Sequence, residues 1–212
     1  MKKGFSNFIV LLLFAACIIK PLRAQVLNVS EVIQEQDQWC WSATSKCILD
    51  YYAGYSTKSQ CAIADFTRTN ATWHNYGSVN CCTDPSKGCN YANYTWGYKG
   101  SMEEILNVFG NIKSNNLNRT LSIAEIATEI KNGRPFYFFW EWYSGGAHAL
   151  VGHGISDKDI YFMNPGKGYG YEIADYDWIE KDNSHFWNRA MTFCMARTPL
   201  WFLLIIQGYP KL

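Results

Sequence analysis

The sequence has few charged residues and no long stretch of charge of one sign. Charged residues make up 17% of the chain, and the formal net charge is +1. A protein that binds nucleic acid or an anionic membrane through its overall field needs a basic surface, so the composition favours neither partner. The hydrophobic fraction of 48% and the aromatic fraction of 17% also exclude a disordered or collagen-like chain.

The chain also lacks an apolar run of about 20 residues, the length that a transmembrane helix needs. It begins instead with Lys2 and Lys3, continues with an uncharged apolar segment over residues 8–19, and reaches a plausible cleavage site at Ala24. This pattern predicts a signal peptide over residues 1–24. The protein is then secreted, periplasmic or extracellular, with no stable membrane insertion after cleavage. The alternative is a lipoprotein anchor at Cys17, because residues 14–17 resemble a lipoprotein cleavage box.

No internal repeat and no linker interrupts the remainder, so residues 25–212 are expected to form one domain, a monomer. Seven of the eight cysteines lie in this part, and an odd number indicates one free thiol. If Cys40 is free, the others can form up to three disulfides, with fifteen possible pairings: Cys47, Cys61, Cys81, Cys82, Cys89 and Cys194. A zinc site at Cys81, Cys82 and Cys89 is the rival interpretation, but adjacent cysteines fit zinc-ligand spacing poorly. No metal or cofactor is expected.

Helical patterns dominate the first half of the domain and strand patterns the second. Residues 40–52 have apolar side chains near helical spacing, and residues 101–109 and 122–132 each begin with Ser and carry Glu three residues later, the pattern of a capping box. Residues 134–142, 147–155 and 160–164 are typical of strands, separated by turns. Residues 55–100 are rich in Thr, Asn, Gly and Cys and are expected to be mostly loop. Helices followed by an antiparallel sheet indicate an α+β fold.

Three residues have the pattern of thiol-based acyl transfer. Cys40 begins a predicted helix, where the helix N-terminus stabilises a thiolate. His148 begins a strand after the small residues at 145–147, and Asn164 ends the next strand. Two antiparallel strands bring His148 and Asn164 together, so Asn164 can orient the imidazole that activates Cys40. Taken singly, His148 would be a core histidine and Asn164 a turn residue before proline.

The segment Gln34-x5-Cys40-Trp41, followed by the glycine-rich turn, His148 and Asn164, resembles the papain-like cysteine peptidases. The closest branches are compact bacterial ones, namely plant-pathogen effector peptidases and bacteriocin-processing peptidases. The resemblance implies a cysteine-bearing helix packed on an antiparallel sheet, a protein or peptide substrate, and an oxyanion-binding role for Gln34. Gln36 and Gln38 are rivals for that role. The Cys-Gly-Ser-Cys-Trp segment of papain itself is absent here, since Asp37, Gln38 and Trp39 precede Cys40, so substrate preference cannot be transferred.

Two other classes of function stay open. One is a related Cys-His acyl-transfer enzyme, such as a transglutaminase or a cell-wall amidase; the other is an inactive papain-fold module that binds peptides. His153 is five residues from His148 and is expected on the opposite side of the strand. His74 and His185 fall in segments typical of loops, with no evident partner. The aromatic residues Trp140, Trp142 and Tyr143 are expected in the core, with a substrate subsite as the alternative.

Overall fold

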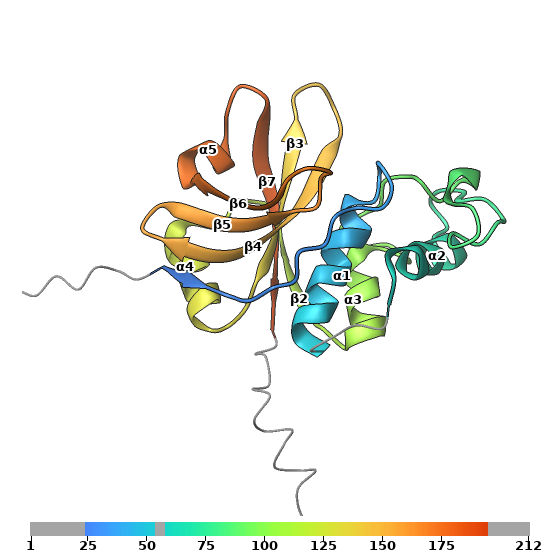
Figure 1. Cartoon of the computed structure of the whole chain (residues 1–212), viewed down its shortest axis with the longest axis horizontal. Coiled ribbons are helices and arrows are strands. Elements are labelled where there is room, and N and C mark those ends of the chain that lie inside the picture. The colour runs from blue at the N-terminus through green and yellow to red at the C-terminus, as the bar shows by residue number, and fades with distance from the viewer. Residues whose placement is uncertain (1–23, 54–57, 195–212) are drawn as a thin grey trace, which may run out of the picture.

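The computed structural model describes residues 24–53 and 58–194, and in it the helices and the strands separate into two halves, as an α+β fold requires (Figure 1). The helical half contains three helices from the first part of the chain: α1 (Cys40–Ala53), α2 (Gln60–Asn70) and α3 (Met102–Gly110). A 3-10 turn, Pro85–Lys87, lies in the connection between α2 and α3. Two further helices, α4 (Ile123–Lys131) and α5 (Tyr176–Glu180), accompany the sheet.

The second half is a seven-stranded sheet in which all neighbouring strands are antiparallel. The strand order is β2-β7-β3-β4-β5-β6, and β1 pairs with β4. The strands are β1 (Gln25–Val26), β2 (Ser114–Leu117), β3 (Phe136–Trp142), β4 (Ala147–Ser156), β5 (Asp159–Asn164), β6 (Gly170–Asp175) and β7 (His185–Phe193).

The aromatic strand β3 is buried on both faces because the sheet is covered on both sides. Side chains alternate along a strand, so Tyr137 and Phe139 join the core shared with α1 and α3. Phe136, Phe138 and Trp140 join a second core with α4 and α5. The uninterrupted aromatic run thus reflects two cores, and it fixes the sheet between α1 on one side and α4 on the other (Figure 1).

The predicted helices and strands are confirmed with small shifts at their ends. The Ser122–Glu125 capping box is complete, with both reciprocal hydrogen bonds present. At α3 the Ser101 hydroxyl accepts from the Glu104 N–H, but the Glu104 carboxylate accepts from Gly100 N–H instead of Ser101 N–H. That second capping box is therefore only half formed.

Strand β7 was not predicted, although it lies inside the sheet, between the edge strand β2 and β3. Its sequence carries Arg189 at an interior position, and charged side chains are usually exposed to solvent. In the fold, Arg189 Nη2 donates to Glu141 Oε1 at 2.5 Å, and Glu141 lies on the adjacent strand. A cross-strand ion pair thus makes the charge compatible with a central strand.

One disulfide joins the loop-rich segment to α2, and a second closes a loop within that segment. Cys61 pairs with Cys82 and Cys81 pairs with Cys89, so neither adjacent cysteine is available to zinc. Cys47 is free and buried in α1, with Sγ 3.2 Å from the Ser30 carbonyl oxygen, and Cys194 is free and exposed. The expectation of a single free thiol is therefore wrong, because three described cysteines are unpaired: Cys40 and Cys47, which both lie on α1, and Cys194, which follows β7.

Several predictions fall on parts of the chain that the structure does not describe. The proposed signal peptide and Cys17 lie there, apart from Ala24, as does the apolar segment at 199–206. Within residues 24–53 and 58–194, no helix is both long and apolar enough to cross a membrane.

Candidate functional site

Cys40 is the first residue of α1, and its position is set by the tryptophans on either side of it. Trp39 is 1% exposed and donates its indole N–H to the Cys89 carbonyl at 2.8 Å. Trp41 is also buried and donates to the Tyr91 carbonyl at 2.9 Å. These two bonds attach the start of α1 to the loop that contains the Cys81–Cys89 disulfide. The Cys40 thiol is consequently held at the helix N-terminus, where unpaired backbone N–H groups favour an anion.

His148 and Asn164 meet as the strand pattern predicted. His148 is the second residue of β4 and faces Trp140 on β3, while Asn164 is the last residue of β5. Val151 of β4 pairs with Met163 of β5. Because the two strands are antiparallel, the next residue of β5, Asn164, lies closer to the end of β4 that carries His148. His148 Nε2 lies 2.8 Å from Asn164 Oδ1, which leaves Nδ1 as the ring nitrogen that can face Cys40.

A fourth residue, Glu172 on β6, extends this chain of hydrogen bonds. Asn164 Nδ2 donates to Glu172 Oε2 at 2.7 Å, and Gly166 N–H donates to Asn164 Oδ1 at 3.0 Å. Asn164 is 4% exposed, and both the oxygen and the nitrogen of its side-chain amide are hydrogen-bonded. Sequence reasoning missed Glu172 because β6 was not predicted. The register of β5 and β6 identifies Glu172, because Asn164 pairs with Gly170. Glu172 is two residues further along β6 and therefore lies on the same face of the sheet as Gly170.

The electrostatics of the site favour charge separation between Cys40 and His148. Burial alone would raise the pKa of the Cys40 thiol, but the hydrogen bond and charge of His148, with the backbone N–H groups of Ala149 and Trp41, hold that pKa below its usual value. Burial would likewise lower the pKa of His148. The Cys40 thiolate, the bond to Asn164 and the charge of Glu172 instead raise that pKa. Both shifts favour a thiolate beside an imidazolium over the neutral pair.

Gln34 lies in the same cavity as His148 and Asn164, and its side-chain amide is engaged with the main chain. Its Nε2 donates to Gln36 O at 3.0 Å and to Asp37 O at 2.8 Å. The Gln34 backbone N–H donates to Pro165 O at 2.7 Å, next to Asn164. The backbone carbonyl of Gln36 accepts a hydrogen bond from the Gln34 amide. Gln38 lines a different cavity, which also contains Cys40. The three glutamines therefore occupy different positions around Cys40.

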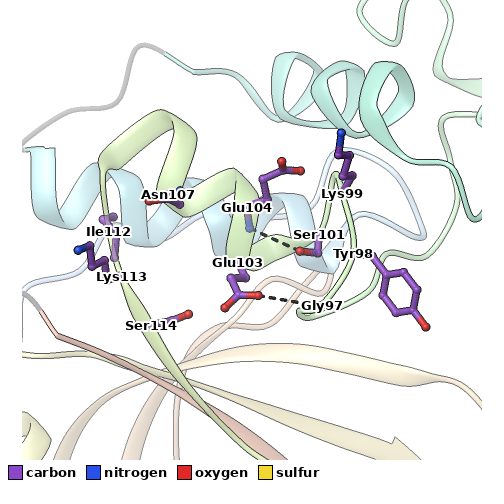
Figure 2. A pocket seen from close by; sticks show the side chains of 10 residues that line it. All are labelled: Gly97, Tyr98, Lys99, Ser101, Glu103, Glu104, Asn107, Ile112, Lys113 and Ser114. Atoms are coloured by element: carbon purple, nitrogen blue, oxygen red, sulfur yellow. Dashed lines mark hydrogen bonds between the residues drawn. The ribbon is translucent and has the colours of Figure 1, made fainter.

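Two cavities flank the Cys40–His148 pair. The first, of about 200 Å³, is lined by Cys40 and Ala149 and has Arg189 in its wall. The second, of about 380 Å³, is lined by His148, Asn164 and aromatic side chains from β3 and α5. A substrate that crosses the pair would extend into both. A larger cavity of about 570 Å³ lies apart, around the start of α3 and the segment 112–114; Cys40 and His148 do not line it (Figure 2).

The other histidines have structural partners. His153 Nδ1 lies 3.0 Å from the Leu27 carbonyl oxygen, which attaches the N-terminal segment to β4. His74 stacks on Tyr91, with ring centroids 3.6 Å apart. His185 begins β7, and its Nδ1 lies 2.9 Å from Asp182 Oδ1. The expectation that His74 and His185 lack partners is therefore wrong, because their neighbours are brought in by loop folding.

The structure gives no indication of a metal centre in the part of the chain that it describes. Residues 24–53 and 58–194 contain no group of three or more His, Cys, Asp or Glu side chains that could hold an ion. The chemistry of the site is instead that of a thiol, an imidazole and the amide that orients the imidazole.

The chain is similar to known peptidases in sequence pattern and in fold. A model of the Peptidase_C39 like family matches residues 26–192. One similar solved structure is described as a double glycine motif protease from an AMS/PCAT transporter in complex with the leader peptide; it shares 18% identity, with 82% of this chain and 97% of that chain covered and a TM-score of 0.47. Another is a putative C39-like peptidase from Bacillus anthracis, with 16% identity, 82% and 98% coverage and a TM-score of 0.48. No curated protein matches the chain.

Proposed function

Because the chain belongs to the peptidase C39-like family and is a cysteine-type peptidase, we propose that it cleaves peptide bonds with a Cys40–His148–Asn164 triad through a thioester intermediate. The observation that carries the proposal is the position of His148. One ring nitrogen is held by Asn164 at 2.8 Å, and the imidazole shares a hydrogen bond with the Cys40 thiol at the start of α1. Nucleophile, base and orienting group are thus in contact in the order that acyl transfer requires.

The first half of the reaction forms the thioester. The Cys40 proton resides on His148, and the thiolate sulfur attacks the carbonyl carbon of the scissile peptide bond. The resulting oxyanion needs donors, and the Cys40 backbone N–H is suitable because the first N–H groups of a helix have no helical acceptor. His148 then gives its proton to the leaving nitrogen as the C–N bond breaks, which releases the amine product and leaves the acyl group on sulfur.

The second half regenerates the enzyme. The neutral imidazole of His148 removes a proton from water, and the hydroxide adds to the thioester carbonyl. The C–S bond then breaks, the acid product leaves, and the proton returns to the Cys40–His148 pair. Gln34 is the proposed second oxyanion donor. Because its Nε2 donates to Gln36 O and Asp37 O, the substrate oxygen must replace one of these carbonyls as acceptor.

We also propose that the protein is exported through the signal peptide at residues 1–24 and that residues 25–212 form the mature peptidase. The two disulfides support export, because disulfides persist in oxidising compartments. A peptide or protein substrate follows from the peptidase activity.

Labelling with a thiol-directed epoxide tests the proposed nucleophile, and the chain carries its own controls. The epoxide should modify Cys40 at neutral pH, because its thiol has a lowered pKa. Cys47 should stay unmodified, because burial raises the pKa of its thiol well above the usual value. Exposed Cys194 should react much more slowly than Cys40. Peptide mapping by mass spectrometry identifies the modified residue. Labelling of Cys194 alone would contradict an activated Cys40 and favour an inactive peptide-binding module.

Two substitutions test how His148 is held. Asn164→Ala should lower kcat by about 100-fold, because a misoriented base loses most of the benefit of general acid–base catalysis. Glu172→Gln keeps an acceptor for Asn164 Nδ2 but removes a negative charge that raises the pKa of His148. The pKa of His148 should therefore fall, and the alkaline limb of the pH–rate profile should move to lower pH with a smaller loss of kcat. Equal losses in both variants, with no shift of the limb, would show that Glu172 acts only through folding.

A further inference from the structure

The cavity beside His148 contains more aromatic surface than the proposed chemistry uses. Its walls include Trp140 and Trp142 from β3, Trp178 from α5 and Tyr169 from the β5–β6 turn. Trp178 is 44% exposed and Tyr169 is 64% exposed. Large aromatic side chains gathered at an open cavity indicate a binding surface, because isolated exposure is common but a cluster is not. The volume of about 380 Å³ is sufficient for a long side chain.

The three tryptophans surround the ring of His185 at the start of β7. The centroid of Trp140 lies 4.3 Å from that of His185, and the centroids of Trp178 and Trp142 lie at 5.1 and 5.6 Å. Trp140 also makes edge contacts with Trp142 and Trp178. The β3–β4 turn and the connection from α5 to β7 lie at the same end of the sheet, which brings these rings together (Figure 1).

Two acceptor groups, on His185 and Glu172, accompany the His148 imidazolium and the donor amides of Gln34 and Asn164 in this cavity. Asp182 Oδ1 lies 2.9 Å from His185 Nδ1, so Nδ1 carries the hydrogen and Nε2 presents a lone pair in the neutral ring. His185 is 1% exposed, and its Nε2 has no hydrogen-bond partner among the described residues. Glu172 adds a carboxylate, of which Oε2 accepts from Asn164. None of the described residues that line this cavity is Lys or Arg. Exposed ring faces and the Glu172 carboxylate attract a cation.

The proton that His148 gives to the leaving nitrogen determines which part of the substrate lies in the aromatic cavity. His148 must reach the leaving nitrogen, so the residue that carries this nitrogen lies on the His148 side of the pair. The aromatic cavity is lined by His148 and Asn164, whereas the cavity on the opposite side is lined by Cys40 and contains Arg189. We propose that the aromatic cavity binds the side chain of the first residue of the leaving amine product, and that it takes a basic side chain, arginine or lysine. This inference rests on the proposed peptidase mechanism and names its substrate class.

A randomised peptide library measures this preference directly. The full chain is incubated with the library, and the new N-terminal residues are identified by mass spectrometry. Arginine and lysine should be enriched at the new N-terminus. A matched pair of peptides, with arginine or its neutral isostere citrulline at that position, should differ by about tenfold in kcat/KM, because citrulline loses the cation–π and charge interactions. Enrichment of acidic or small residues, or equal cleavage of the pair, would overturn the inference while leaving the peptidase mechanism intact.

Substitutions then connect the preference to the cavity. Trp178→Ala should bring the arginine-to-citrulline ratio close to one, whereas Trp178→Phe should retain most of it because a ring face remains. Tyr143→Ala is the matched control, because Tyr143 is 54% exposed at the same end of the sheet but does not line the cavity. An unchanged ratio in Trp178→Ala would assign the preference elsewhere and refute this site. If the wild-type chain produces no new N-termini, the proposed function fails, and this inference with it.

Discussion

Replacing Cys40 with alanine should abolish peptide hydrolysis, with a loss of at least about 10⁴-fold in kcat/KM, because Cys40 is the thiol that shares a hydrogen bond with His148 among the described residues. The fold should persist, since Cys40 is only half-buried and the buried rings of Trp39 and Trp41 still fix the start of α1. Cleavage of a peptide library is the measurement, with circular dichroism to verify folding.

The other two free thiols are the matched controls for this loss. Cys194→Ala changes an exposed position, and Cys47→Ala removes a buried sulfur that lies in the core against the Ser30 carbonyl. Both variants should cleave the library at close to the wild-type rate, with a small loss of stability for Cys47→Ala. If Cys40→Ala retained activity while Cys47→Ala lost it, the assignment of the nucleophile would be wrong. If no protein cleaved any peptide, a transferase with another acceptor would become the better explanation.

Replacing His148 with alanine should move the reactivity of Cys40 to alkaline pH. In the wild type, His148 is the largest influence that lowers the pKa of the thiol against the effect of burial. Without it, burial dominates and the pKa rises. An ordinary thiol with a pKa of about 8.5 is less than about 1% thiolate at pH 6. Alkylation of Cys40 at pH 6 should therefore slow by about 100-fold or more, and iodoacetamide labelling against pH measures it.

The sign of the pH dependence in the wild type follows from the same two shifts. The reactive pair needs a deprotonated Cys40 and a protonated His148. It forms as pH rises through the lowered pKa of Cys40, and it is lost as pH rises through the raised pKa of His148. Activity should therefore be bell-shaped, with an acid limb from Cys40 and an alkaline limb from His148. In His148→Ala the acid limb of alkylation should lie at higher pH; an unchanged limb would mean that helix α1 alone activates the thiol.

The residues proposed as nucleophile, base and orienting amide could be singled out from sequence because each lies at the boundary of a locally determined element. Cys40 precedes a run with helical periodicity, His148 follows a glycine turn into a strand, and Asn164 ends the next strand. Local propensities determine such boundaries, and a short antiparallel turn determines which residues meet. The 2.8 Å contact between His148 and Asn164 agrees with that geometry.

The role of Glu172 and the packing of three tryptophans around His185 could not be predicted. Both depend on strands, β6 and β7, whose sequences do not alternate clearly. Strand β6 has half its residues exposed, and β7 carries Arg189, whose charge is neutralised by Glu141 on a strand about fifty residues away in sequence. Both strands are recruited by pairing with neighbours, and such non-local pairing overrides local preference. The cysteine pairing was undetermined for the same reason, since fifteen arrangements satisfy the sequence equally well.

The sequence by itself therefore determined the α+β order of elements and the residues of a thiol-based site, because periodicity, helix capping and turn chemistry act over a few neighbouring residues. The tertiary structure decided how that site is supported and what surrounds it. It placed Glu172 behind Asn164, left Cys47 and Cys194 unpaired, and collected three tryptophans around His185 beside the catalytic pair. Those contacts join residues far apart in the chain, and only the packing of the sheet against its helices brings them within reach.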